Sequence, residues 1–173
     1  KEKKKQEILT HLIKDPTESM RNISRITGMN RRTVYQIQKD YEKDHTIWGY
    51  TTVVDEQRLN RFVYLTQFKT RPFTKAFADL IHQRLTRDLG DTEKYGIRIL
   101  DIDYLSGEYT VHIKFSAPNH ATAQHYFETL RSVYRDHFLD EPQICIVNDS
   151  FVRMGKVHPT LKHVLYSHVP TVK

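Results

Sequence analysis

Two neighbouring arginines at the start of a candidate helix carry the clearest chemistry in this sequence. Val34 and Ile37 follow Arg31 and Arg32 at a spacing that places them on one buried helix face. The outward side chains, with a capping residue ahead of them, are then Asn30, Arg31, Arg32, Thr33, Tyr35, Gln36 and Lys39. Guanidinium groups can bond guanine bidentately, amides can bond adenine, and hydroxyl and ammonium groups suit phosphate oxygens. These residue types therefore favour contact with double-stranded DNA.

Three short helices are expected to position these arginines. Ser19 is a suitable N-cap for the second helix, Gly28 can end it with a positive φ, and Asn30 can cap the third. A tight turn that contains glycine is typical of a helix-turn-helix, whose second helix enters the major groove. The apolar periodicity predicts an inward face made of Ile8, Leu9, Leu12, Ile13, Met20, Ile23, Ile26, Val34, Ile37 and Tyr41.

A strand or small hairpin is expected next, at 46–55, where β-branched and aromatic residues gather in "TIWGYTTVVD". It would form the wing of a winged helix-turn-helix. Paired arginines at a helix start also occur on ordinary solvated faces, but charge supports the DNA interpretation. Residues 1–61 hold 13 Lys+Arg against 9 Asp+Glu, a net of +4, whereas 62–173 hold 14 against 12, a net of +2.

The rest of the chain alternates between strand and helix patterns. Strands are expected at 62–70, 96–105, 108–115 and 142–152, with helices at 73–89 and from 118 onward. The predicted inward side chains of these helices are Phe73, Phe77, Leu80, Ile81, Leu85, Phe127, Leu130, Tyr134 and Phe138. The order β-α-β-β-α-β is that of a ferredoxin-like fold. The predicted fold class is α+β, a winged helix-turn-helix followed by a ferredoxin-like effector and dimerisation domain.

The change of pattern near residue 60 predicts the domain organisation. The DNA-binding domain is expected over 1–55, a linker over 56–61, the ferredoxin-like domain over 62–155 and a C-terminal tail over 156–173. Cys145 is the single cysteine, so no intrachain disulfide can form, which fits a cytoplasmic protein. No apolar run is long enough to span a membrane.

Other reactive side chains do not form a convincing catalytic or metal site. Pairs of histidines five residues apart do not share a helix face, so no metal is expected. Asp101 and Asp103 share one face of a strand, a spacing that paired carboxylates could use, although a polar solvent face is the stronger interpretation. Cys145 is expected to be a buried strand residue. We predict no catalytic residue and no cofactor.

The sequence resembles the Lrp/AsnC, or feast/famine, transcription regulators of bacteria and archaea, and the archaeal type is favoured. The resemblance covers about 5–152 and rests on three segments, namely "ISRITGMNRRTVYQIQKDYE", "IWGYTTVVDEQRL" and "SGEY". It implies a transcription regulator that binds palindromic DNA as a dimer or a higher oligomer. It also implies a small effector, such as an amino acid, held between ligand domains near Ser106, Gly107, Glu108, Tyr109 and Thr110.

One departure from the family pattern bears on the effector. The family has an aspartate where this chain has Thr110, and a hydroxyl cannot neutralise a bound ammonium. We therefore expect ordinary amino acids to bind weakly or not at all. The alternative function is that of a sirohaem decarboxylase, because the architecture predicted for this chain resembles that of those enzymes. Arg98 and His112 would be the candidates to line a tetrapyrrole cleft.

Overall fold

The computed structural model describes residues 2–87 and 92–170. Lys1, the predicted end of a helix at 88–89, and the end of the predicted tail at 171–173 lie outside the described residues. The chain forms two compact units, 1–52 and 53–173, which are described separately. No helix among the described residues is long and apolar enough to cross a membrane.

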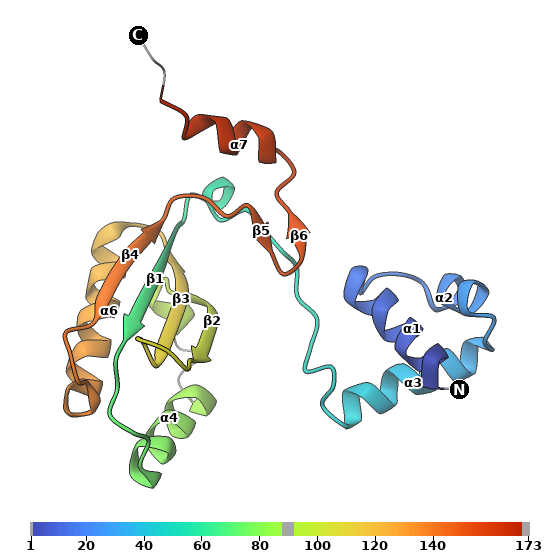
Figure 1. The fold of residues 1–173 in the computed structure, drawn as a ribbon, viewed down its shortest axis with the longest axis horizontal. Helices are drawn as coiled ribbons and strands as arrows, with labels where there is room; N and C mark the ends of the chain where they lie inside the picture. The colour runs from blue at the N-terminus through green and yellow to red at the C-terminus, as the bar shows by residue number, and fades with distance from the viewer. Residues whose placement is uncertain (1, 88–91, 171–173) are drawn as a thin grey trace. The chain divides into compact units, whose positions relative to one another are not determined.

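The first unit consists of helices α1 (Glu2–Lys14), α2 (Met20–Thr27) and α3 (Arg31–Lys43) (Figure 1). Each helix contributes one wholly buried side chain to a shared core, and these are Ile8, Ile23 and Val34. Leu12 and Ile37 complete it. The helix-turn-helix predicted from the capping residues and the apolar spacing is confirmed.

Two residues of the predicted inward face are instead exposed, Ile13 at 71% and Ile26 at 44%. On α2 the buried stripe runs through Ile23 to Thr27, which lies one turn further on and is 4% exposed. The Thr27 hydroxyl donates to the Ile23 carbonyl oxygen at 2.8 Å, which satisfies it inside the core. A polar residue with a local acceptor thus takes the position that the apolar pattern assigned to Ile26.

The predicted strand or hairpin at 46–55 is not formed. This segment is irregular, and none of its described residues pairs in a sheet. Its side chains attach it to the helices instead, because Ile47 packs against the helical core and the Tyr50 hydroxyl bonds to α3. A two-stranded hairpin with no third strand is marginal in water, so side-chain anchoring prevails over β-propensity here.

The second unit contains a four-stranded antiparallel sheet with the strand order β2-β3-β1-β4. In chain order the elements are β1 (Phe62–Phe68), α4 (Lys75–Arg87), β2 (Arg98–Tyr104), β3 (Val111–Ala117), α6 (His120–Tyr134) and β4 (Gln143–Val147) (Figure 1). A short 3-10 turn at Gln57–Leu59 precedes β1, and two more lie between later elements, at Glu93–Tyr95 and Arg135–His137. The predicted β-α-β-β-α-β arrangement is confirmed.

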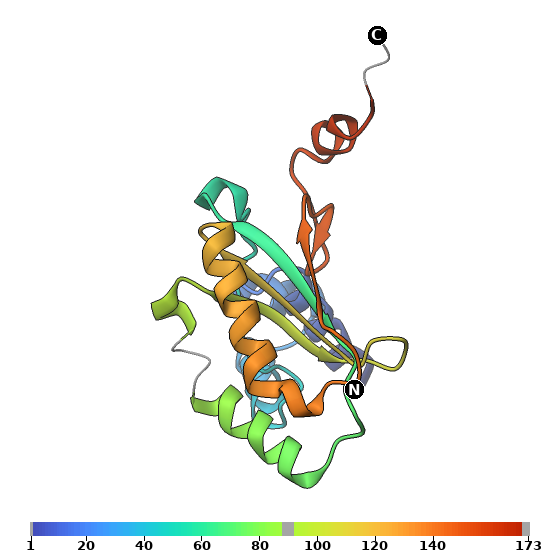
Figure 2. The ribbon, with the colours of Figure 1, turned by 90° about the vertical axis from the view of Figure 1, so that its left-hand side faces the viewer.

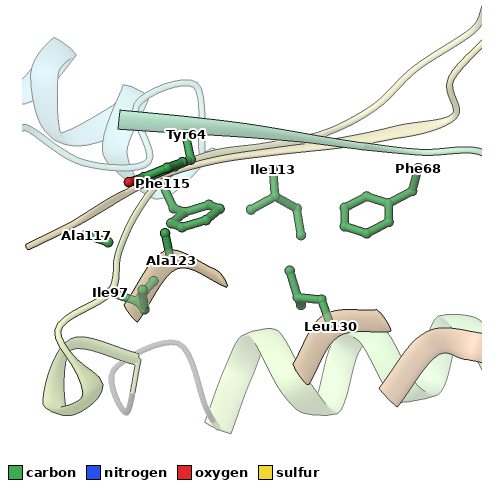
Figure 3. Packing of buried hydrophobic residues seen from close by; sticks show 8 residues of the cluster. All are labelled: Tyr64, Phe68, Ile97, Ile113, Phe115, Ala117, Ala123 and Leu130. Carbon is green, nitrogen blue, oxygen red and sulfur yellow. The ribbon is translucent and has the colours of Figure 1, made fainter. Parts of the chain in front are cut away.

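The core of this unit lies between the sheet and α6, which runs along one face of it (Figure 2). The rings of Tyr64 on β1 and Phe115 on β3 stack with their centroids 5.5 Å apart. Ala123 of α6 lies next to Phe115, and Leu130 of α6 points towards Ile113 (Figure 3). Ile113 and Phe115, two residues apart on β3, are both buried on this face.

Helix α4 is less deeply packed than its apolar pattern predicts. Phe77 is its one buried residue among those described, whereas Leu80 and Ile81 are half-buried. Phe73, which precedes the helix, is 42% exposed and Leu85 is 40% exposed. The predicted inward face is therefore wrong at both ends.

Cys145 lies in a strand as predicted, but it is exposed rather than buried. Its strand, β4, is at the edge of the sheet, and Cys145 pairs with Leu65 of β1. Because Tyr64 and Phe68 face α6, the alternation of β1 places Leu65 and its partner on the opposite face, away from that helix.

The C-terminal residues contain more structure than the sequence pattern indicated. Strand β5 (Val152–Arg153) pairs with β6 (Lys156–Val157), and a helix, α7 (Leu161–Ser167), follows. Gly155 has a φ of 73° in the connecting turn, which glycine adopts without strain.

Candidate nucleic-acid interface

The start of α3 is fixed by two residues of the preceding turn. Gly28 has a φ of 64° and ends α2. Asn30 then adopts an extended conformation, and its side-chain oxygen accepts a hydrogen bond from the Arg32 backbone N–H at 2.8 Å. With Val34 and Ile37 buried, the outward side of the helix is determined.

The predicted interface residues all lie at the exposed surface of the first unit. They are Asn30, Arg31, Arg32, Thr33, Tyr35, Gln36 and Lys39. Among the described residues, the guanidinium groups of Arg31 and Arg32 have no hydrogen-bond or ion-pair partner. Their positive charge is therefore not neutralised within the described part of the chain.

Two other residues of the predicted interface, Gln36 and Lys39, bond to carboxylates of the same helix. Gln36 Nε2 donates to Asp40 Oδ1 at 2.9 Å, and Lys39 Nζ donates to Glu42 Oε2 at 2.5 Å. The Lys39 ammonium also lies 5.7 Å from the centroid of the Tyr35 ring. Binding DNA through these two side chains would require them to leave their present partners.

Glu42 is at the centre of a polar network that sequence reasoning missed. Its Oε1 accepts from the Tyr50 hydroxyl at 3.0 Å, and Gln38 Nε2 donates to the same hydroxyl oxygen at 2.7 Å. The hydrogen bond from Lys39 holds the pKa of Glu42 below its usual value, and the pKa of Lys39 is raised by the same bond. Both groups therefore stay charged at neutral pH. The spacing of Lys39 and Glu42, three residues apart on a helix, could have indicated this pair.

Lys3, Lys4 and Lys5 lie on α1. A Cβ atom added at Gly28 would lie 3.7 Å from the Lys4 ammonium nitrogen. Lys4 thus brings positive charge to the turn of the helix-turn-helix.

The predicted effector loop, 106–110, connects β2 to β3 outside either strand. Ser106, Gly107 and Glu108 are exposed, whereas Tyr109 and Thr110 are half-buried. The strand predicted to begin at Glu108 begins instead at Val111, so Glu108 and Thr110 lie in the loop.

The Thr110 hydroxyl is used within the fold. It accepts from the Thr70 backbone N–H at 2.8 Å and lies 2.8 Å from the Thr70 hydroxyl oxygen. The Thr110 backbone N–H donates to the Phe68 carbonyl oxygen at 2.9 Å. Thr110 therefore anchors the loop to the end of β1 instead of presenting its hydroxyl to a ligand.

Residues 56–61, predicted as a linker, belong to the second unit. Glu56 is 2% exposed and accepts a hydrogen bond from the Arg98 guanidinium. Arg153 Nη1 and Arg61 Nε lie 3.5 Å and 3.8 Å from its carboxylate oxygens. A buried carboxylate is costly unless it is paired, and these arginines supply the pairing.

The residues considered for a tetrapyrrole cleft are likewise paired. Arg98 bonds to Glu56, and His112 Nε2 lies 2.9 Å from Asp103 Oδ2 across the β2–β3 pair. Asp101 and Asp103 are exposed opposite Lys114 and His112, in agreement with a polar sheet face. The described residues contain no group of three or more side chains suited to hold a metal ion.

Comparison with known proteins supports the fold. No protein-family model and no curated protein matches the sequence. The leucine response regulatory protein LrpA of Mycobacterium tuberculosis is 10% identical, with a TM-score of 0.67 over 90% of this chain and 97% of that one. An AsnC family transcriptional regulator from Agrobacterium tumefaciens is 12% identical, with a TM-score of 0.60 over 90% and 95%.

A third solved structure, a transcriptional regulator of Neisseria meningitidis in complex with L-Met, is 15% identical, with a TM-score of 0.64 over 94% of this chain and 97% of that one. The chain therefore has the fold of these regulators, a helix-turn-helix unit followed by a β-α-β-β-α-β unit.

Proposed function

We propose that this chain is a sequence-specific DNA-binding transcription regulator of the Lrp/AsnC type, which acts as a dimer or a higher oligomer and has no catalytic role. The observation that carries the proposal is the start of α3, where Arg31 and Arg32 are exposed and unneutralised by described residues behind an asparagine cap. The fold shared with transcription regulators supports it.

The roles of the interface residues follow from their chemistry. Arg31 and Arg32 would contact base edges, because guanidinium groups discriminate guanine in the major groove. Thr33, Tyr35 and Lys39 would contact phosphates and position the helix. Affinity should fall steeply with salt, since each neutralised phosphate releases counterions and contributes about 0.9 to the slope of log K against log salt.

The first prediction concerns base recognition. Selection of bound sequences from random DNA should yield a defined site, and Arg31→Ala or Arg32→Ala should weaken binding to it by about 1–3 kcal/mol and relax preference at one position. Arg71→Ala is the matched control, because Arg71 is exposed in the second unit. An unchanged footprint and affinity in both α3 variants would show that α3 is not the recognition helix.

The second prediction concerns the Lys39–Glu42 pair. Glu42→Gln should tighten DNA binding, because it removes a negative charge from the interface and releases the Lys39 ammonium for a phosphate. If Lys39 gains one phosphate, the salt slope should steepen by about 0.9. The measurement is the affinity for the selected site as a function of salt.

Glu7→Gln is the control for this second prediction, since Glu7 is exposed on α1 and the charge change is the same. Adding Lys39→Ala to Glu42→Gln should abolish the steeper slope. Equal gains from Glu7→Gln and Glu42→Gln would mean that net charge alone is responsible.

The third prediction concerns assembly. The sheet face opposite α6 carries half-buried Leu65 beside exposed Cys145, and we propose that this face forms a two-fold dimer. Such a dimer would place two recognition helices roughly 34 Å, or a multiple of it, apart on one face of DNA. Light scattering at micromolar concentration should report a dimer or larger, and Leu65→Glu should shift it towards monomer.

Leu139→Glu is the control for assembly, because Leu139 is 55% exposed and lies in the loop before β4. A monomeric wild-type protein would rule out the proposed dimer. If Leu65→Glu and Leu139→Glu shift the oligomeric state equally, the dimer contact does not involve the sheet face that carries Leu65.

The fourth prediction concerns free amino acids at the loop 106–110. A bound ammonium needs an acidic or carbonyl partner, and the Thr110 hydroxyl is already bonded to Thr70. We infer that ordinary amino acids bind this chain weakly or not at all. Calorimetry with each of the twenty amino acids should find no micromolar dissociation constant, and a single such constant would refute the inference.

A further inference from the structure

Each of the four residues 54–57 is contacted by the C-terminal segment 148–158. Arg153 of β5 makes two of these contacts, because its Nη1 donates to the Val54 carbonyl oxygen at 2.9 Å and lies 3.5 Å from Glu56 Oε1. Figure 1 shows β5 beside the chain that leads into β1. The Arg153 side chain is 19% exposed, so water screens these contacts less than it would at an open surface.

The other two residues of 54–57 are held by the two ends of the C-terminal segment. At its start, Gln57 Nε2 donates to the Asn148 carbonyl oxygen at 2.6 Å and lies 3.3 Å from Asp149 Oδ1. At its end, His158 Nε2 lies 3.7 Å from Asp55 Oδ2. The contacts therefore extend along the whole of 54–57 and do not depend on a single pair.

The hairpin within this segment needs these contacts for its own stability. Met154 and Gly155 have φ values of 48° and 73°, as in the two-residue turns with two positive φ values that join short antiparallel strands. A lone two-stranded hairpin is marginal in water. Val152 and Val157 pair across the strands but are 58% and 60% exposed, so the hairpin gains little from apolar burial. Its contacts with 54–57 are thus the main restraint on it.

The place of 54–57 in the chain gives these contacts a consequence. The first unit ends at Thr52 and the second begins at Val53, so 54–57 is the part of the second unit next to the joint. We infer that 148–158 is a strap, which fixes 54–57 to the second unit and so shortens the free joint between the two units.

The effect of the strap on DNA binding rests on the function and the dimer proposed above. Two DNA-binding units in one dimer bind two half-sites, and the second binding step is intramolecular. Its effective concentration depends on the length and stiffness of the connection, and a connection that matches the required span gives the highest value. The strap therefore favours DNA that carries two half-sites over DNA that carries one.

Hydrogen exchange of the full chain tests the strap in the absence of DNA. Gln57→Glu places a carboxylate against the Asn148 carbonyl and the Asp149 carboxylate, so the amides of 54–57 should exchange about tenfold faster or more, with exchange in α6 unchanged. Gln83→Glu is the control, because Gln83 is exposed on α4 and the charge change is the same. Unchanged exchange of 54–57 in Gln57→Glu would overturn the strap.

Arg153→Gln tests the same strap through different contacts. It removes the bond to Val54 and one cation from Glu56, so exchange of 54–57 should again be about tenfold faster. Arg71→Gln, at an exposed position of the second unit, should leave it unchanged. Circular dichroism checks folding, and if Arg153→Gln does not fold, Gln57→Glu decides alone, since Gln57 is exposed.

The ratio of affinities for DNA with two half-sites and with one tests the consequence. Gln57→Glu should lower this ratio about tenfold, whereas Gln83→Glu should not change it. Faster exchange of 54–57 with an unchanged ratio would overturn the role of the strap in two-site binding. A wild-type chain that binds neither DNA would refute the proposed function, and the exchange measurement would still decide whether the strap exists.

Discussion

The direction of α3 depends on one backbone conformation, the positive φ of Gly28. An L-residue with a side chain would lose about 1–2 kcal/mol in this region. Because α2 ends there, the chain reverses within Met29 and Asn30, and the asparagine side chain then caps α3. Once the helix starts at this point, Val34 and Ile37 enter the core and the paired arginines must face outward. The chemistry proposed for the interface is thus a consequence of turn geometry.

In the second unit, a cleft lined by the sheet, α4 and α6 depends on how closely each helix packs against the sheet. β1 is central in the sheet and pairs with both β3 and β4. The Phe115 ring of β3 contacts the Tyr126 ring of α6, with the centroids 4.9 Å apart, and so holds that helix close to the strands. In the described part of the other helix, α4, Phe77 is the one buried residue, and it stacks on His137 beside the end of α6. A cleft lined by apolar side chains follows from this unequal packing.

Local signals in the sequence predicted the local structure well. Ser19, Gly28 and Asn30 have the capping roles that their residue types indicated, and the outward set on α3 followed from them. Features that depend on partners distant in the sequence were not predictable. The segment 46–55 has strand composition but pairs with no strand among the described residues. Cys145 is exposed because it lies on the sheet face opposite α6. The polar network at the interface was missed because it requires Tyr50 to fold back onto α3.

Two carboxylates, Glu56 and Glu42, pair with cations of this chain and so limit which positive charges are available to bind an external anion. Glu56 engages three arginines of the second unit, so those cations serve the fold. Glu42 engages Lys39 in the same way at the far end of the interface. At the start of α3, by contrast, Arg31 and Arg32 have no such partner among the described residues. Guanidinium groups read base edges, whereas any cation can contact a phosphate. If α3 binds DNA as proposed, its start would supply the specificity, and Glu42 would adjust the electrostatic contribution of Lys39.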